Sequence, residues 1–180
     1  LFVWDFDQTI LSIHAWGLRV KQADVPRRNI RSDVADLDTF VSFVSHVTSA
    51  GHEVAVASFG SKEVIQEYLA RIFALAGQHN PFSEHMIATP RLQGHPDGTS
   101  LPDGKVSLLE KLCAKSRLAS AGGGRLARKR VVFFDDDDAN VASAISAGFE
   151  HSFHVPAAFT KAQLTNILEH AESAAGRPRS

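Results

Sequence analysis

Two stretches of the sequence place carboxylates directly after an apolar run. In LFVWDFDQT, Asp5 and Asp7 follow four apolar residues, and Thr9 comes two positions later. In VVFFDDDD, the aspartates 135–138 follow a second apolar run. Charge at the end of a buried strand is costly unless another group compensates it. Both stretches therefore require a partner, and a site made of oxygen atoms favours a hard cation such as Mg²⁺.

The elements that must position these residues alternate between strand-like and helical patterns. Short apolar runs predict strands, and apolar residues three and four positions apart predict the helices between them. The predicted strands are 1–4, 53–57, 84–88, 131–134 and 149–155. The predicted helices are 37–50, 62–76, 105–118, a short helix with Val141 and Ile145 that ends at Gly148, and a last helix after the capping box TKAQ at 160–163.

This alternation predicts an α/β fold. We expect a three-layer, Rossmann-like parallel sheet of about five strands with helices on both faces. One domain should span residues 1–175, with a flexible tail at 176–180. Ligands of such sheets bind outside the carboxyl ends of the strands, so the acidic stretches should converge there.

Convergence of several carboxylates needs positive charge. Two like charges about 4 Å apart repel by roughly 4 kcal/mol at an effective dielectric constant near 20. Besides a metal ion, a lysine could compensate them, and Lys105 is best placed because it precedes the third predicted helix. The alternative lysines are Lys111, Lys115 and Lys129. Ser58, which follows the run EVAVA, joins the same edge of the sheet.

Together these motifs resemble the haloacid dehalogenase-like hydrolase superfamily. DFDQT is similar to its first motif, Asp-x-Asp-x-Thr, and Ser58 to the Ser or Thr of its second. Lys105 matches the lysine of its third motif, and Asp135 with Asp136 matches the acidic pair of its fourth. The motifs occur in the order of the family and cover nearly the whole chain.

The resemblance implies a Mg²⁺-dependent phosphatase. Asp5 would attack phosphorus to form an aspartyl-phosphate, and Asp7 would serve as general acid and then base. The metal ligands would be the Asp5 carboxylate, the backbone carbonyl of Asp7, and Asp135 with or through Asp136. The groups that bind the substrate phosphate would be Thr9, Ser58 and Lys105, with Lys105 also restraining Asp5. Asp137 and Asp138 fit a helix N-terminus instead.

The residues that follow Asp5 indicate which of the reactions known in the superfamily to expect. Within the superfamily, an acid at the position of Asp7 is typical of phosphatases and is missing from dehalogenases and phosphonatases. Phe6 replaces the lysine that P-type ATPases carry there. Gln8 departs from the frequent glycine and should narrow the site without abolishing the reaction.

The spacing of the motifs leaves no room for a large cap domain. Fewer than thirty residues separate Thr9 from the helix near Leu37, and a hairpin-like flap should occupy several of them. Capless members of the superfamily often act on macromolecules, and the chain looks most like the small magnesium-dependent phosphatases. The expected substrate is therefore a phosphoprotein or a sugar phosphate. We expect the loop 89–104 to border the site and to contact the substrate.

Two other functions remain open. One is a phosphatase or phosphotransferase that acts on nucleic-acid ends. The other is a catalytically idle domain that binds a phosphorylated partner, although such a module needs neither Asp5 nor Asp7. The nine histidines lack the spacing of a zinc site, and we interpret them as structural or exposed.

Composition limits the partners and the compartment. The formal net charge of −1 gives no global electrostatic reason to bind nucleic acid or a membrane. Cys113 is the only cysteine, so no internal disulfide forms, and this is compatible with a reducing compartment. No apolar run approaches the roughly 20 residues that span a bilayer. We expect an intracellular, cytoplasmic protein, although the chain starts at Leu1 and a targeting segment before it is not excluded.

Overall fold

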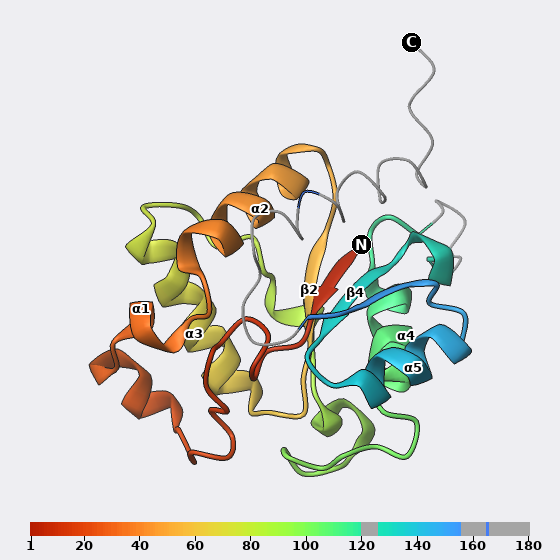
Figure 1. Cartoon of the computed structure of the whole chain (residues 1–180), viewed down its shortest axis with the longest axis horizontal. Helices are drawn as coiled ribbons and strands as arrows, with labels where there is room; N and C mark the ends of the chain where they lie inside the picture. Colours follow the sequence, from red (N-terminus) through yellow and green to blue (C-terminus); the bar gives the residue numbers. More distant parts are fainter. Residues whose placement is uncertain (120–125, 156–164, 166–180) are drawn as a thin grey trace.

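A five-stranded sheet lies at the centre of the protein, and its neighbouring strands are all parallel (Figure 1). The structure is a computed structural model that describes residues 1–119, 126–155 and 165. In chain order the strands are β1 (Phe2–Trp4), β2 (Val54–Ala57), β3 (Ile87–Ala88), β4 (Val132–Asp135) and β5 (His151–His154). Their order across the sheet is β3-β2-β1-β4-β5. The predicted α/β fold with five parallel strands is confirmed.

The order of the strands reverses beside β1, the central strand. The chain moves outward from β1 to β2 and β3, and then crosses to β4 and β5 on the other side. Val3 of β1 pairs with Ala55 on one side and with Phe133 on the other. In open α/β sheets, ligands bind beyond the carboxyl ends of the strands at such a reversal. Asp5, which follows β1, and Asp135, which ends β4, both lie at this edge.

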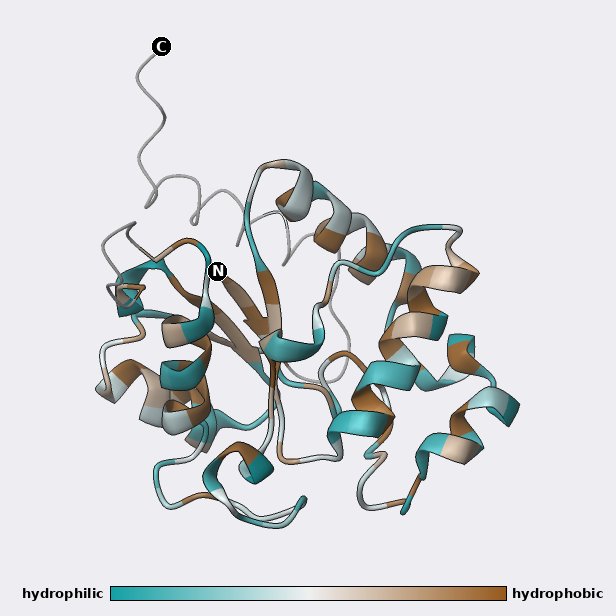
Figure 2. Ribbon diagram, turned by 180° about the vertical axis from the view of Figure 1, so that it is seen from behind, coloured by the Kyte–Doolittle hydropathy of each residue, from teal (hydrophilic) through white to brown (hydrophobic). Residues whose placement is uncertain are grey.

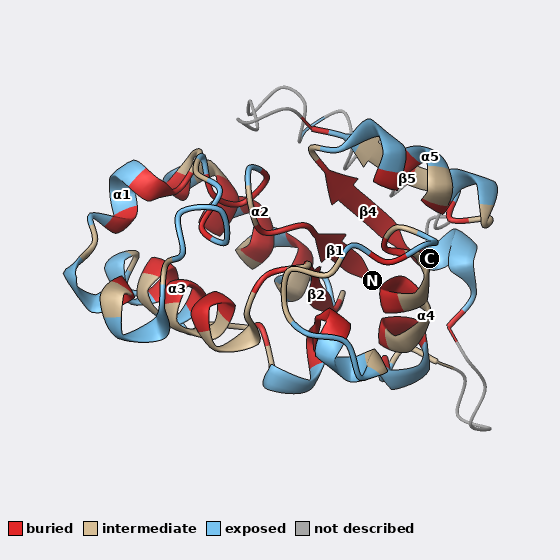
Figure 3. Ribbon diagram, turned by 90° about the horizontal axis from the view of Figure 1, so that it is seen from below, coloured by how far each residue is buried: buried red, intermediate tan, exposed pale blue. Residues whose placement is uncertain are grey.

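Helices cover both faces of the sheet and complete the predicted three layers. The α-helices are α1 (Ile30–Asp33), α2 (Leu37–Ser49), α3 (Lys62–Leu75), α4 (Val106–Lys115) and α5 (Asp138–Ser146). The 3-10 helices are η1 (Gln22–Arg27), η2 (Glu84–Met86), η3 (Pro90–Gln93) and η4 (Arg128–Arg130). Helices α2 and α3 pack on one face, and α4 and α5 on the other (Figures 1 and 3). In the described part of the chain, none of them combines the length and apolar composition that a bilayer crossing requires.

Strands β1 to β4 are buried on both faces, so their side chains divide between two apolar clusters. Phe2 and Trp4 belong to the cluster under α2 and α3, whereas Leu1 and Val3 belong to the cluster under α4 and α5. Trp4 is fully buried and meets the ring of Phe40 edge to face at 5.9 Å. The apolar colouring of the strands in Figure 2 reflects this double burial. Each large side chain buried in this way contributes about 1.5–3 kcal/mol to folding.

Three predicted elements differ from the structure or lie outside it. Residues 84–86 of the predicted third strand form η2, and only Ile87 and Ala88 pair with β2, at its last two residues. Ile145, which was expected on the apolar stripe of α5, is 48% exposed because it lies at the edge of the buried face that Asn140, Val141 and Ala144 form. The helix predicted after residue 160 and the tail 176–180 lie outside the described residues.

Neither segment that could have carried a cap contains a folded domain. Residues 9–36 hold η1 and α1, and an antiparallel bridge between Leu11 and Val34 brings their ends together. This is the predicted hairpin-like flap. Between β3 and α4 the chain forms only η3 and turns. The prediction that a large cap domain is missing is therefore confirmed for these two described segments.

A buried carboxylate fastens the base of the flap to α3. Asp33 accepts hydrogen bonds from Arg28 Nε at 2.5 Å, from Arg28 Nη2 at 2.9 Å and from the Tyr68 hydroxyl at 2.7 Å. Burial raises the pKa of Asp33, but the hydrogen bonds from Arg28 and Tyr68 lower it by more than burial raises it. The pKa therefore lies below its ordinary value. The ionised form of Asp33 is thus the form that stabilises the flap.

We predict that Tyr68→Phe lowers the free energy of unfolding at pH 7 by about 1.5–3 kcal/mol, because it removes a buried hydrogen bond to a charged group. Asp33 has a lowered pKa, so its contribution is complete above the ordinary carboxyl range and is lost as the pH falls through the folded-state pKa. Urea denaturation should show the difference between Tyr68→Phe and the unmodified protein shrinking in acid. Asp38→Asn, at an exposed carboxylate, is the control and should change stability by less than about 0.5 kcal/mol. A pH-independent loss would contradict the role of Asp33.

Candidate functional site

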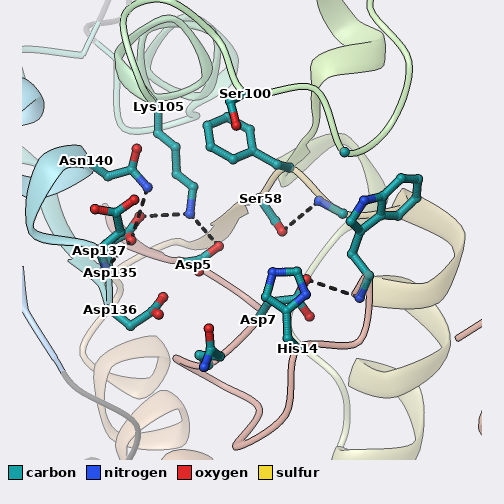
Figure 4. Close-up of a pocket in the computed structure, with 15 residues that line it drawn as sticks. Asp5, Asp7, His14, Ser58, Ser100, Lys105, Asp135, Asp136, Asp137 and Asn140 are labelled. Carbon is teal, nitrogen blue, oxygen red and sulfur yellow. Dashed lines mark hydrogen bonds and ion pairs between the residues drawn. The ribbon is translucent and has the colours of Figure 1, made fainter. Parts of the chain in front are cut away.

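The predicted site residues meet at the carboxyl edge of the sheet, around a cavity of about 260 Å³ (Figure 4). Asp5 follows β1, Ser58 follows β2, and Asp135 ends β4. Lys105 reaches the same place from the start of α4. Six of the seven predicted site residues line the cavity: Asp5, Asp7, Ser58, Lys105, Asp135 and Asp136.

Lys105 joins the ends of β1 and β4. Its Nζ lies 2.5 Å from Asp5 Oδ1 and 2.8 Å from Asp135 Oδ2, and all three side chains are buried. Burial lowers the pKa of Lys105, but the charges of Asp5 and Asp135 raise it more, so the lysine is protonated. Among the lysines considered from the sequence, Lys105 is the one in this position.

Asp5 lies in an environment that disfavours the ionised form of a carboxyl group. Burial raises its pKa well above the ordinary carboxyl value, and the charge of Asp135 raises it further, whereas Lys105 lowers it. One lysine therefore does not fully compensate the two carboxylates. The arrangement favours an additional positive group nearby.

A third carboxylate completes a group that could hold a metal ion. Asp5, Asp135 and Asp136 each offer one oxygen atom, and these three atoms lie within 4.8 Å of one another. Three negative charges against the single charge of Lys105 leave an excess of two. The donors are all carboxylate oxygens, which hard divalent cations prefer. The residues present thus fit a divalent ion at the end of β1 and β4.

Asp135 is held rigidly by groups that sequence reasoning missed. Its Oδ1 accepts hydrogen bonds from the Asp137 amide at 2.9 Å and from Asn140 Nδ2 at 3.2 Å. Asn140 is buried in the first turn of α5. Its spacing from Asp135 is the feature of the sequence that could have indicated this role. Asp137 also accepts from the Ala139 amide as the N-cap of α5, as expected for an acid at a helix N-terminus.

Asp7 faces the cavity but stands apart from the three clustered carboxylates. Its Oδ1 accepts from the Ala15 amide at 2.7 Å, and its Oδ2 from the Trp16 amide at 3.4 Å, so it holds the flap. Burial raises the pKa of Asp7, and these amide hydrogen bonds oppose the rise only in part. A raised pKa favours the protonated form of the carboxyl group, which a general acid needs. The predicted metal contact through its backbone carbonyl stays a prediction.

Thr9 and Ser58 occupy different positions relative to the cavity. Gln8 has a left-handed backbone with φ of 61°, and this turn directs Thr9 back into the protein. The Thr9 hydroxyl donates to Asp136 Oδ1 at 3.2 Å, and Thr9 does not line the cavity. Ser58 lines it, and its hydroxyl oxygen accepts the Gly60 amide at 3.1 Å.

The far side of the cavity comes from the flap and from the loop 89–104. His14 and Trp16 of the flap line it; His14 is exposed, as predicted for the histidines, but its place at the cavity was not predicted. Gly98 and Ser100 line it from the loop, so the prediction that this loop borders the site is confirmed. The only sequence signal for His14 was its place shortly after DFDQT.

No protein-family model matches the chain, and no curated protein matches it. The structure shows a parallel α/β sheet with a largely buried acidic triad at the end of its first strand. Any function must therefore be argued from these residues and their geometry.

We predict that Mg²⁺ stabilises the protein through the three clustered carboxylates. At a concentration 100 times the dissociation constant, the gain is about 2.7 kcal/mol, which raises the melting temperature by several degrees. Asp136→Asn should abolish most of this rise in a thermal-shift titration. Asp138→Asn, which removes an exposed acid of the same run outside the cavity, should leave it intact. Equal responses of the two variants would exclude the proposed ligands.

We also predict that the backbone at Gln8 is strained. A left-handed conformation costs a residue other than glycine about 1–2 kcal/mol. Gln8→Gly relieves this cost, partly offset by the greater freedom of glycine in the unfolded chain, whereas Gln8→Ala removes the same side chain and keeps the strain. In urea denaturation, Gln8→Gly should therefore be the more stable of the two by up to about 1 kcal/mol. Equal stability of Gln8→Ala and Gln8→Gly would contradict the predicted backbone strain.

Proposed function

We propose that the protein is a Mg²⁺-dependent phosphatase of the haloacid dehalogenase-like class, which hydrolyses a phosphate monoester through an aspartyl-phosphate on Asp5. The observation that carries the proposal is the position of Asp5. It lies within one cluster with Asp135 and Asp136 and in contact with Lys105, at the floor of an open cavity. The four motifs of the superfamily thus lie around one site.

Asp5 is the nucleophile. Lys105 holds its Oδ1, which orients the carboxylate and leaves Oδ2 as the attacking atom. The bond from Oδ2 to phosphorus forms while the bond from phosphorus to the ester oxygen breaks. Water then attacks the phosphorus of the aspartyl-phosphate, the bond to Asp5 breaks, and inorganic phosphate leaves.

Asp7 transfers the protons. In the first half it protonates the departing ester oxygen, and in the second half it accepts a proton from the attacking water. The raised pKa of Asp7 favours the protonated form that the first half needs. The amides of Ala15 and Trp16 fix the direction of its carboxyl group.

The other site residues bind the phosphoryl group and balance its charge. Lys105 supplies positive charge beside the attacked phosphorus, and the Ser58 hydroxyl, whose oxygen is occupied by the Gly60 amide, donates to a phosphoryl oxygen. Asp5, Asp135 and Asp136 would hold Mg²⁺, which when bound neutralises phosphoryl charge and orients the group. Thr9 supports Asp136 from behind instead of binding phosphate.

The open site favours a substrate larger than the phosphoryl group alone. Within the described residues, the flap and the loop 89–104 border the cavity beyond the strand ends, and no folded cap covers it. A phosphoprotein or a sugar phosphate is therefore the proposed substrate, and nucleic-acid ends are the less favoured one. The protein is proposed to act in the cytoplasm.

We predict that purified protein releases phosphate from small phosphate monoesters only in the presence of Mg²⁺. Asp5→Asn should reduce the rate at least 10³-fold, because an amide cannot form the covalent intermediate. Asp7→Asn should slow the reaction by about 10²–10⁴-fold through the loss of acid–base catalysis. Asp138→Asn is the matched control and should keep full activity.

Acid quench of a rapid reaction with ³²P-labelled ester should trap label on the protein, and mass spectrometry should locate it on Asp5. Release that needs neither Mg²⁺ nor Asp5 would overturn the mechanism. Binding of phosphorylated ligands without release from any ester would indicate an idle binding module instead.

A further inference from the structure

The reaction proposed above leaves one side of the cavity without a role. That side contains His14, which the flap places beside Asp7 (Figure 4). Its Nδ1 accepts a hydrogen bond from the Gly17 amide at 2.7 Å. A backbone amide is always a donor, so Nδ1 carries no proton and the neutral ring is protonated on Nε2. The geometry therefore fixes the tautomer of His14.

Gly17 is the residue that allows this contact. A Cβ atom at position 17 would lie 2.7 Å from His14 Nδ1, closer than side chains approach in proteins. Any larger residue would push the ring out of its place. The turn 14–17 thus holds the histidine ring by Nδ1, and the residue lines the cavity.

The flap is anchored on the carboxylate that would serve the leaving group. Asp7 accepts the amides of Ala15 and Trp16, the two residues between His14 and Gly17. Across the cavity, Lys105 and the clustered carboxylates mark where the phosphoryl group would bind. A leaving group beside Asp7 would consequently lie beside His14.

The flap also contacts the loop 89–104 beside the cavity. The indole of Trp16 lies against Gly98, which has a φ of +80° and no room for a side chain. The Gly98 amide donates to the carbonyl of Phe59 at 2.6 Å. Flap and loop therefore meet through Trp16 and Gly98, next to the part of the cavity that His14 lines.

We propose that His14 is a specificity-determining residue whose Nε2–H donates a hydrogen bond to an oxygen of the leaving group. The favoured substrates are phosphate monoesters that carry a hydroxyl or ether oxygen near the ester oxygen. This inference rests on the proposed phosphatase activity and deepens it. It predicts discrimination between esters that are alike in size and differ in that acceptor.

Two substitutions separate this role from a structural one. In His14→Asn, the side-chain oxygen takes the place of Nδ1 and keeps the Gly17 contact, but the Nε2 donor is lost. In His14→Gln, the amide nitrogen takes the place of Nε2 and keeps the donor, but the Gly17 contact is lost. The probe esters are glycerol 1-phosphate and propyl phosphate, which has the same carbon chain without hydroxyl groups.

The unmodified protein should prefer glycerol 1-phosphate, measured as the ratio of kcat/KM values. His14→Asn should reduce this preference about three- to tenfold, the value of one hydrogen bond, and His14→Gln should keep most of it. If His14 only shapes the flap through its contact with Gly17, His14→Gln should lose more of this preference than His14→Asn. An equal loss for both esters would likewise overturn the proposal.

A spectroscopic measurement distinguishes failure of this inference from failure of the proposed function. Imidazole ¹⁵N shifts at a pH where the ring is neutral should show the Nε2–H tautomer for His14, and Gly17→Ala should disturb it. Glycerol 1-phosphate bound to the Asp5→Asn variant should shift the Nε2 resonance, whereas propyl phosphate should not. If the two esters do not differ in this shift, the inference is wrong, even if hydrolysis occurs. If the shift is present but no hydrolysis occurs, only the phosphatase proposal is wrong.

Discussion

The contact of one buried lysine with two carboxylates is the constraint on which the rest of the site depends. Lys105 connects Asp5, after β1, to Asp135, at the end of β4, so it links two adjacent strands with the start of α4. Buried ion pairs add little net stability, but removal of one partner costs about 3–5 kcal/mol because it leaves an uncompensated charge. The pairing therefore serves to fix positions. It keeps two repelling carboxylates close enough to act on a common ligand.

Much of this arrangement could be predicted because it follows from chain order and strand direction. An apolar run followed by Asp5, and another followed by Asp135, are enough to bring both to one edge once the sheet is parallel. The position of Lys105 follows from a helix that must begin at that edge. These predictions need the type and order of elements and are insensitive to errors of one or two residues at their ends.

The parts that were missed depend on backbone detail within turns. The left-handed turn at Gln8 directs Thr9 toward Asp136. The periodicity of apolar residues does not predict such a turn. His14 enters the site only because Asp7 accepts two amides of the flap. The third strand is shorter than predicted, because Glu84–Met86 form a 3-10 helix and only Ile87 and Ala88 pair with the end of β2. Turn geometry, the amides that Asp7 binds and the extent of strand pairing decided these cases, and none of them shows in the periodicity of the sequence.

The bridge between Leu11 and Val34 has a consequence for how the protein could diversify. The flap leaves and rejoins the sheet-bearing body at one point, and Asp33 with Tyr68 clamps that point onto α3. Length and composition between the two ends can change without moving β1 or α2. The flap is therefore a segment through which recognition properties can change, provided that the amides of Ala15 and Trp16 that hold Asp7 stay in place.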